Sequence, residues 1–395
     1  MKILVVATKS PWPPQDGGRL ALWLTMQGLA AAGHELMLVA PVESGVEARC
    51  AATFDALQSV CVPHLLVSPR RHWLGAVSSA LATGRSLSVV RHRAVVIEEG
   101  VARCVASWRP HLIHVEQLQA LANCDAARAA KIPIVLRMQN IESSLWNQVA
   151  RLRTVAWPLR WEARRLRREE RRALRVAARV VALTESDARQ LREMEDINAE
   201  SHVFAVAPAF PRELDCAMRL EGAPSIVLAG STGWWPNEHG IRWFADAVMP
   251  LLTSRVPTAR AHVFGGPPID RVGILWHRAP AEAIDAFPAA SIVAIPLHVG
   301  SGIRMRILDA WARGLPVVAT SVAAAGLPVV SGRELLIADS AVEFVDAIRR
   351  LGQDESLRQT LVAAGRLYLA RHHDGVAVTA DLLRVYGQAV SATGS

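Results

Sequence analysis

Cysteine is scarce in this chain of 395 residues, and its scarcity excludes some classes of protein. The five cysteines are scattered and include no C-x-x-C pair: Cys50, Cys61, Cys104, Cys124 and Cys216. An odd, dispersed set does not build a disulfide framework or a structural zinc site. It agrees with a reducing compartment.

Long hydrophobic runs are missing as well. No run reaches the ~18 apolar residues that a membrane-spanning helix needs. The apolar run at residues 3–7 is short and is followed by Lys9 and a proline cluster, so we interpret it as a first strand and not as a signal peptide. We therefore expect a cytoplasmic protein that is either soluble or attached to the membrane from its cytoplasmic side.

Acidic residues are rare in one stretch, residues 151–179. That stretch holds eleven arginines and three glutamates without lysine or aspartate, and its net charge of +8 equals that of the whole chain. The rest of the chain is therefore balanced. This argues against a diffuse nucleic-acid-binding surface and predicts one local basic feature.

The order of apolar segments predicts an α/β protein of two doubly wound domains. A strand at residues 2–7, a glycine- and proline-rich loop, a helix at 19–32 and a strand at 35–41 open such a fold. The pattern restarts with a strand at 225–229. We expect a first Rossmann-like domain over residues 1–205, a second over 206–375, and a last helix, 376–395, that packs back on the first. Further strands are expected at 60–67, 110–115, 132–136, 180–184, 261–265, 291–297, 317–320 and 335–338.

Residues 291–320 carry the clearest chemical signal. A strand is followed by Gly300, Ser301 and Gly302, and then by a helix predicted over 303–313. A glycine loop that leads into a helix can bind an anion through backbone N–H groups, and Arg304 adds a guanidinium suited to phosphate. Asp309 could accept hydrogen bonds from the hydroxyls of a sugar. An ordinary strand–turn–helix with a solvated arginine is the alternative.

This segment resembles the donor-binding segment of glycosyltransferase family 4, often written GSGIR-x-K-x-LEA-x-A-x-G-x-PVV-x-T. The matching positions are Gly300, Ser301, Gly302, Ile303, Arg304, Leu308, Ala310, Ala312, Gly314, Pro316, Val317, Val318 and Thr320. The chain departs at Arg306, where the family often has lysine, and at Asp309, where it usually has glutamate. An acid found in the wider family eight residues before that glutamate is Ser301 here.

The resemblance implies a GT-B fold, in which two Rossmann-like domains face each other across a cleft. It also implies transfer of a sugar from a nucleotide-diphosphate sugar, with retention of configuration and without a metal or other cofactor; no D-x-D pair stands near the donor loops. The implied donor-binding residues are Gly17, Gly18, Gly230, Ser231, Gly265, Gly300, Ser301, Gly302, Ile303, Arg304 and Asp309. Arg304 would stabilise the charge that develops on the leaving diphosphate.

The acceptor side would come from the first domain. Relatives often show R-x-HN-x-E-S after the strand at 132–136, and this chain has Gln139 at the histidine position, followed by Asn140. Glutamine cannot act as a base, although it can orient a hydroxyl. With Glu116, these residues are the predicted acceptor contacts. A nucleotide-sugar-binding protein that has lost transfer activity and a nucleotide-sugar epimerase are the alternatives.

The arginine-rich stretch predicts a helix at 159–178. One interpretation is docking on an anionic membrane surface through the arginines between Arg160 and Arg175, which would bring a lipid-linked acceptor near the site. The other is a solvated helix whose glutamates pair with arginines along the same helix.

Overall fold

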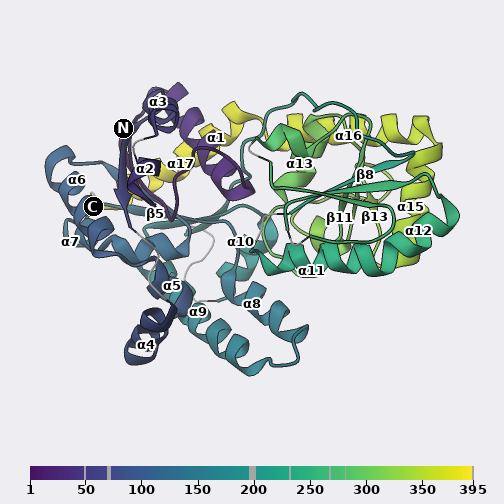
Figure 1. Ribbon diagram of the computed structural model, residues 1–395. Coiled ribbons are helices and arrows are strands. Elements are labelled where there is room, and N and C mark those ends of the chain that lie inside the picture. The colour runs from purple at the N-terminus through teal and green to yellow at the C-terminus, as the bar shows by residue number, and fades with distance from the viewer. Residues whose placement is uncertain are drawn as a thin grey trace. The chain divides into compact units, whose positions relative to one another are not determined.

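The computed structural model describes residues 1–48, 50–68, 73–194, 202–230, 233–266, 268–280 and 282–393. The chain forms two compact units, which are drawn in Figure 1. Unit 1 contains Met1–Pro13, Gly18–Ala209 and Gly375–Ser395, and unit 2 contains Pro14–Gly17 and Phe210–Asp374. The main change of unit thus falls between Ala209 and Phe210, near the predicted boundary at 205–206.

Unit 1 is built on a parallel sheet of seven strands in the order β3-β2-β1-β4-β5-β6-β7. The strands are β1 (Lys2–Val6), β2 (Glu35–Val42), β3 (Val62–Val67), β4 (Leu112–Glu116), β5 (Ile134–Met138), β6 (Arg179–Ala182) and β7 (Val203–Ala205). The strand predicted at 180–184 was expected to be the last of this domain, and that expectation was wrong, because β7 follows it. With only three residues, β7 is too short for a pattern of period two to reveal it.

Helices cover both faces of this sheet. They are α1 (Gly17–Ala31), α2 (Gly45–Ala48), α3 (Ala51–Gln58), α4 (Trp73–Thr83), α5 (Leu87–His92), α6 (Val95–Trp108), η1 (Leu118–Asn123, a 3-10 helix), α7 (Asp125–Ala129), α8 (Glu142–Arg151), α9 (Trp157–Val176), α10 (Glu185–Arg192) and α17 (Gly375–Thr393). Gly100 lies inside α6, where a Cβ atom would stand 2.4 Å from Leu66 Cδ1, so glycine allows α6 to approach β3 closely.

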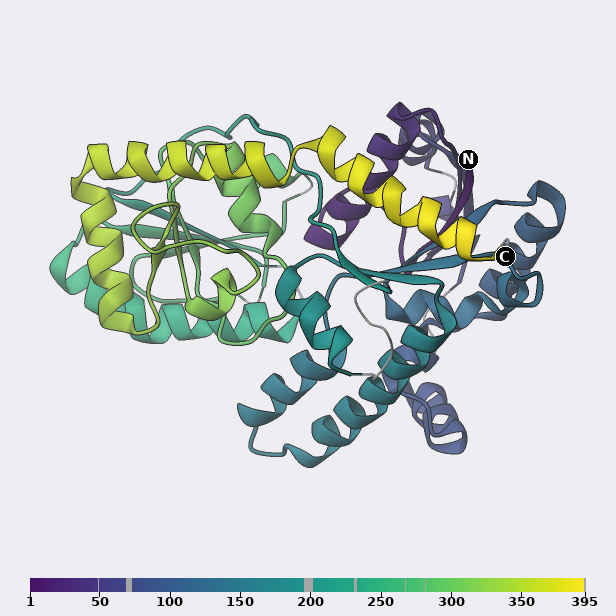
Figure 2. The ribbon, with the colours of Figure 1, turned by 180° about the vertical axis from the view of Figure 1, so that it is seen from behind.

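The end of the chain belongs to unit 1. Helix α17 contacts β4, β5 and β6, and its Val378, Leu382 and Tyr386 enter the same hydrophobic cluster as Ile3 and Val5 of β1. Figure 2 shows this helix, in yellow, lying along the unit. Unit 1 is therefore completed by a segment far away in the sequence.

Unit 2 repeats the architecture with a parallel sheet of six strands in the order β10-β9-β8-β11-β12-β13. The strands are β8 (Ser225–Ala229), β9 (Arg260–Phe264), β10 (Ile274–His277), β11 (Ile292–Ile295), β12 (Val317–Ala319) and β13 (Leu336–Ile337). The helices are α11 (Trp235–Trp243), η3 (Phe244–Val248, a π-helix), α12 (Met249–Arg255), η4 (Ala283–Ala286, a 3-10 helix), α13 (Met305–Ala312), α14 (Ser321–Ala324), α15 (Ala341–Gln353) and α16 (Glu355–His372). The prediction of two Rossmann-like domains is confirmed.

Candidate functional site

The glycine loop of unit 2 lies at the carboxyl ends of the parallel strands, where ligands of open α/β sheets bind. It joins β11 to α13, and α13 begins at Met305 instead of at residue 303 as predicted. Arg304 is the residue before the helix and has an extended backbone, with φ −88° and ψ 92°. The N–H groups of residues 300–303 therefore belong to the loop before the helix, and the predicted helix start at these residues was wrong.

The carboxyl ends of β8 and β9 approach each other closely beside this loop. Gly265 has a φ of +74°, and a Cβ atom there would stand 2.4 Å from the carbonyl oxygen of Gly230. Only glycine fits such an approach. Gly230 and Gly265, both predicted donor contacts, therefore meet. Ser231, a third predicted contact, lies outside the described residues.

Arg304 folds back over the loop that carries it. Its guanidinium carbon lies 5.8 Å from the centre of the Trp234 ring and 3.4 Å from the place where a Cβ atom on Gly300 would stand. Trp234 precedes α11, so Arg304 lies between the loops that follow β8 and β11. The sequence did not predict this contact.

A second guanidinium stands beside the first. Burial, together with the positive charge of Arg304, lowers the pKa of Arg306 to about 10. Its Nη1 lies 3.4 Å from Oδ1 of Asn237. The sequence analysis noted Arg306 only as a departure from the usual lysine. In the predicted helix over 303–313 these two residues would not face each other. They can do so because Arg304 has an extended backbone before the helix begins.

Asp309 lies on α13 and is 6% exposed. Its Oδ1 accepts a hydrogen bond of 2.6 Å from Nε of Arg313, which also donates to the backbone carbonyl of Asp215. Burial raises the pKa of Asp309, while Arg313 opposes the rise. A carboxylate fixed in this way has a defined orientation.

The predicted acceptor residues lie at the carboxyl ends of strands in unit 1. Glu116 is the last residue of β4 and is 2% exposed. Its Oε2 accepts hydrogen bonds from Nε of Arg137 (2.8 Å) and Nε2 of His114 (2.9 Å), and its Oε1 accepts one from Nε2 of Gln139 (2.7 Å). Burial alone would raise the pKa of Glu116, but Arg137 and these donors hold that pKa below its usual range. Glu116 thus stays ionised and holds Gln139.

The network extends to both sides of Glu116. If His114 donates from Nε2, its Nδ1 accepts from the hydroxyl of Tyr386, which joins α17 to the centre of the sheet. On the other side, Nε2 of Gln117 donates to Oε1 of Gln139 over 2.9 Å, and the Thr8 hydroxyl donates to Gln117. The Gln139 amide is therefore fixed at both ends. Asn140 follows in the half-buried turn before α8.

The remaining predicted contacts, Gly17 and Gly18, open α1. The carbonyl of Gly18 accepts a hydrogen bond of 3.2 Å from Nε2 of Gln139. Gly18 thus belongs to the same network as Glu116. Next to this network, a cavity of about 230 Å³ is lined by residues that include Thr8, Lys9, Arg19 and Arg91.

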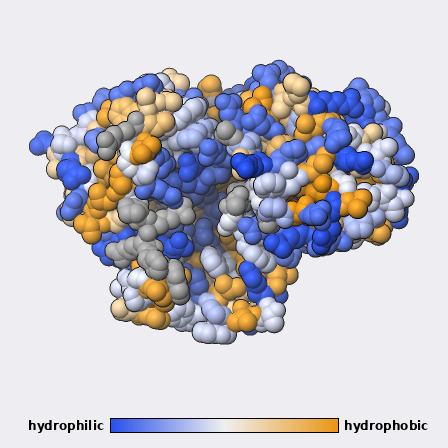
Figure 3. Space-filling model, in the orientation of Figure 1, coloured by the Kyte–Doolittle hydropathy of each residue, from blue (hydrophilic) through white to orange (hydrophobic). Residues whose placement is uncertain are grey.

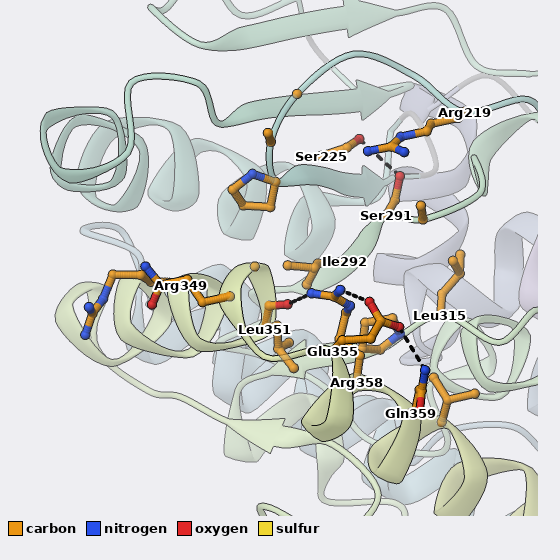
Figure 4. Close-up of a pocket in the computed structure, with 18 of the residues that line it drawn as sticks. Arg219, Ser225, Ser291, Ile292, Leu315, Arg349, Leu351, Glu355, Arg358 and Gln359 are labelled. Carbon is orange, nitrogen blue, oxygen red and sulfur yellow. Dashed lines mark hydrogen bonds and ion pairs between the residues drawn. The ribbon is translucent and has the colours of Figure 1, made fainter.

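Another cavity, of about 610 Å³, lies at the opposite edge of the unit 2 sheet, where strands begin. Figure 4 shows Ser225 and Ser291, whose hydroxyl oxygens are 3.1 Å apart, together with Arg358 and Glu355. The predicted site residues do not line it. Within the described residues, three or more His, Cys, Asp or Glu side chains do not cluster in a way that could hold a metal ion.

The predicted arginine-rich helix is α9, and its three glutamates are buried. Glu162 accepts hydrogen bonds from the Ser86 hydroxyl and two backbone N–H groups, Glu169 accepts two from Arg85, and Glu170 accepts from Ser143. The glutamates thus bond to other segments of unit 1. The outward face carries arginines without acids, at positions 160, 164, 167, 168, 171, 172 and 175. Among the residues that the structure describes, no helix is both long and apolar enough to cross a membrane.

Comparison with protein families gives two matches. Residues 16–207 match the model described as "Glycosyl transferase 4-like domain", and residues 223–354 match that described as "Glycosyl transferases group 1". The chain is 18% identical to an uncharacterized 44.6 kDa protein in the cps region of Klebsiella pneumoniae, over 97% of this chain and 99% of that protein. It is also 31% identical to D-inositol 3-phosphate glycosyltransferase of Corynebacterium diphtheriae, but over only 30% of this chain and 28% of that protein.

Solved structures share the fold over nearly the whole chain. Anabaena HepE in complex with UDP-glucose superposes with a TM-score of 0.66 at 15% identity, covering 98% of this chain and 99% of that one. Sucrose-phosphate synthase of Thermosynechococcus elongatus gives a TM-score of 0.70 at 14% identity, covering 99% of both chains. At these identities the likeness shows the fold, which is that of the GT-B glycosyltransferases.

Proposed function

We propose that this chain, which its family matches and fold identify as a glycosyltransferase of the GT-B type, moves a sugar from a nucleotide-diphosphate sugar to a glycan or lipid-linked acceptor. The observation that carries the proposal is the pair Arg304 and Arg306 beside the loop of Gly300. Two guanidiniums and backbone N–H groups together suit a diphosphate. Solved relatives of the same fold are complexes with UDP and UDP-glucose, which supports a nucleotide-sugar donor.

These two arginines would stabilise the charge that develops during the reaction. When the bond between sugar and diphosphate breaks, negative charge develops on the leaving group, and fixed cations stabilise it. Arg304 and Arg306 would take the part that a divalent ion plays in other transferases, so we propose a reaction without a metal. We also propose retention of configuration, which the resemblance of residues 300–320 to family 4 supports.

Asp309 would bind the ribose of the nucleotide. It lies on α13, directly after the loop with the arginines, and Arg313 holds its Oδ1 in one orientation. A carboxylate accepts hydrogen bonds from two neighbouring hydroxyls without needing to move. This arrangement favours a ribonucleotide as the donor.

Gln139 and Asn140 would contact the acceptor at the carboxyl end of β5. The amide of Gln139 is held by Glu116 and Gln117, so it orients a hydroxyl and does not take its proton. Glu116 is a positioning residue in this account. The cavity beside it, with Lys9 and Arg19 among its lining residues, offers polar groups to the acceptor.

The outward face of α9 supports a proposal about where in the cell the reaction takes place. Its glutamates are buried and bond to other segments of unit 1, so the exposed charged residues of its outward face are arginines. Each arginine near an anionic leaflet contributes about 1 kcal/mol of attraction. We therefore include in the proposal that the enzyme acts at the cytoplasmic surface of the membrane, in the assembly of a polysaccharide or lipid-linked glycan.

A thermal-shift screen of nucleotide diphosphates and their sugars, followed by a turnover assay, tests the proposal. A donor that binds the folded state raises the melting temperature. Turnover that requires an acceptor establishes transfer. Turnover without an acceptor would indicate an epimerase, and binding without turnover a protein that has lost transfer activity. A chain that neither binds nor turns over any nucleotide sugar would contradict the proposal.

A further inference from the structure

Exposed apolar side chains gather where α8 turns into α9. Leu152 is 47% exposed, Val155 63%, Trp157 74% and Trp161 40%. We call these four residues the hairpin tip. Exposed apolar residues scattered singly over a surface are normal, but a group of this kind marks an interaction site. Two of the four are tryptophans, which have an apolar body and a polar N–H group and are common where apolar and aqueous phases meet.

Helix α4 extends this surface. The guanidinium of Arg165 stacks on the Trp161 ring at 3.2 Å and donates to the backbone carbonyl of Ala80 in α4 over 2.9 Å. The next residue, Leu81, is 60% exposed, and Leu74, two helical turns earlier, is 56% exposed. Figures 1 and 2 both show α4, α8 and α9 projecting from the same side of unit 1. Figure 3 shows hydrophobic side chains among hydrophilic ones over this projecting end.

Arginines follow the exposed tryptophans along α9. Trp157 and Trp161 lie one turn apart on the exposed face of α9, and Arg164, Arg168 and Arg172 follow them along that face. The glutamates of the helix point into unit 1, so negative charge does not interrupt the stripe. An apolar, tryptophan-bearing end followed by arginines is the composition of a helix that lies in the headgroup region of an anionic bilayer.

We propose that the hairpin tip inserts into an anionic lipid bilayer, with Leu81 beside it, while the arginines of α9 bind lipid phosphates. The inference rests on the proposed transferase function and deepens it, because it specifies how the acceptor is reached. Strand β5 ends at Met138 and α8 begins at Glu142, so the acceptor residues Gln139 and Asn140 lie directly before the hairpin. Insertion would fix the acceptor edge of unit 1 relative to the membrane.

A second copy of this chain is a poorer occupant of the surface. In a two-fold dimer the same patch would face itself. That arrangement would bring the arginine stripes of both copies together, and like charges in an interface cost binding energy. A bilayer with anionic headgroups has instead a charge complementary to the arginines and an apolar interior for the tip.

Co-sedimentation of the full chain with vesicles separates insertion from charge attraction. The vesicles contain phosphatidylcholine, with or without phosphatidylglycerol, and binding is measured at low and high salt. Salt screens the arginines but not the apolar contact. We expect Val155→Ser/Trp157→Ala to lower the binding that remains at high salt about tenfold. Arg164→Gln/Arg168→Gln/Arg172→Gln should mainly lower binding at low salt. Met218→Ser and Val272→Ser, at residues of unit 2 that are 87% and 83% exposed, are matched controls and should change neither.

Three results would overturn the inference. They are no vesicle binding by the unaltered chain, equal binding by the tip variant, and a tip variant that instead abolishes self-association or nucleic-acid binding. Turnover of a short soluble acceptor analogue is measured in parallel, and the tip variant should retain it. Loss of vesicle binding with intact soluble turnover thus tests insertion alone, whereas absence of turnover in the unaltered chain would count against the proposed function.

Discussion

Each unit holds a buried carboxylate against a buried arginine close to its proposed ligand site, and the two pairs behave differently. In unit 1, Glu116 accepts from Arg137, His114 and Gln139, and its pKa is lowered. In unit 2, Asp309 accepts from a single donor among the described residues, Arg313, and its pKa is raised. Both carboxylates are almost fully buried, at 2% and 6% exposure.

The balance between burial and nearby charges and donors explains the difference. At Glu116, burial is outweighed by Arg137 and His114, and the pKa is lowered. At Asp309, burial outweighs Arg313 and Arg306, and the pKa is raised. Burial disfavours the ionised form of both acids, and only hydrogen bonds and opposite charge offset that cost. Glu116 accepts hydrogen bonds from three protein donors through both of its oxygens. Asp309 has one, so further donors, such as the hydroxyls of a ribose, would stabilise its ionised form. We therefore propose that Glu116 has a structural role and that Asp309 binds the donor.

The largest effect is expected when the charge of Glu116 is removed, because this carboxylate stabilises unit 1. Glu116→Gln leaves the buried Arg137 without its counter-ion, and we expect unit 1 to lose about 3–5 kcal/mol of stability. Thermal or urea unfolding measures the loss. The matched control is Glu98→Gln, because the Glu98–Arg93 pair is partly exposed and should contribute below about 1 kcal/mol. Equal losses in the two variants would show that the Glu116 network does not stabilise the unit.

Arg304→Ala tests the ligand site of unit 2, where we expect an effect on turnover and not on stability. Arg304 lies over the glycine loop and outside the hydrophobic core of unit 2, so its loss should leave the melting temperature unchanged. Turnover should fall by an amount on the order of 2–4 kcal/mol, or about 30- to 1,000-fold, because the leaving diphosphate loses a fixed cation. Arg242→Ala, at an exposed arginine of α11, is the control. Activity within about threefold of the unaltered enzyme would make Arg304 a surface residue without a role in transfer.

The two sites differ in how much of each could be predicted from the sequence. Asp309 and Arg304 belong to one local motif, so their proximity to the glycine loop followed from residues 300–320 alone. The partners of Glu116 come from residues 114, 137, 139 and, through His114, 386, and only the folded sheet brings them together. The sequence could therefore name Glu116 as a candidate but could not show that its oxygens are already occupied.

Two other features were not predicted from the sequence: a short strand, and which face of α9 is buried. Strand β10 was missed because it has only four residues, too few for a pattern of period two to reveal it. For α9 the sequence did contain the answer. Glu162 and Glu169 are seven residues apart and therefore lie on one face, which the structure shows to be the buried one. Counting charges along the helix without assigning them to faces left the pairing of glutamates with arginines open.

The smallest expected effect tests the assignment of Asp309 to binding. Asp309→Asn keeps the size of the side chain but removes an ionic acceptor, so KM for the donor should rise about five- to tenfold, with little change in kcat. Asp309→Glu restores the residue usual in family 4 and should be tolerated.

Because burial raises the pKa of Asp309, the carboxylate takes up its proton at a higher pH than an exposed aspartate does. KM of the unaltered enzyme should therefore rise as the pH falls toward that pKa, whereas KM of Asp309→Asn should show no such rise. Initial rates at several donor concentrations and pH values measure both effects. An unchanged KM with a collapsed kcat would assign Asp309 to the chemical step, and the contrast between a structural and a binding carboxylate would have to be abandoned.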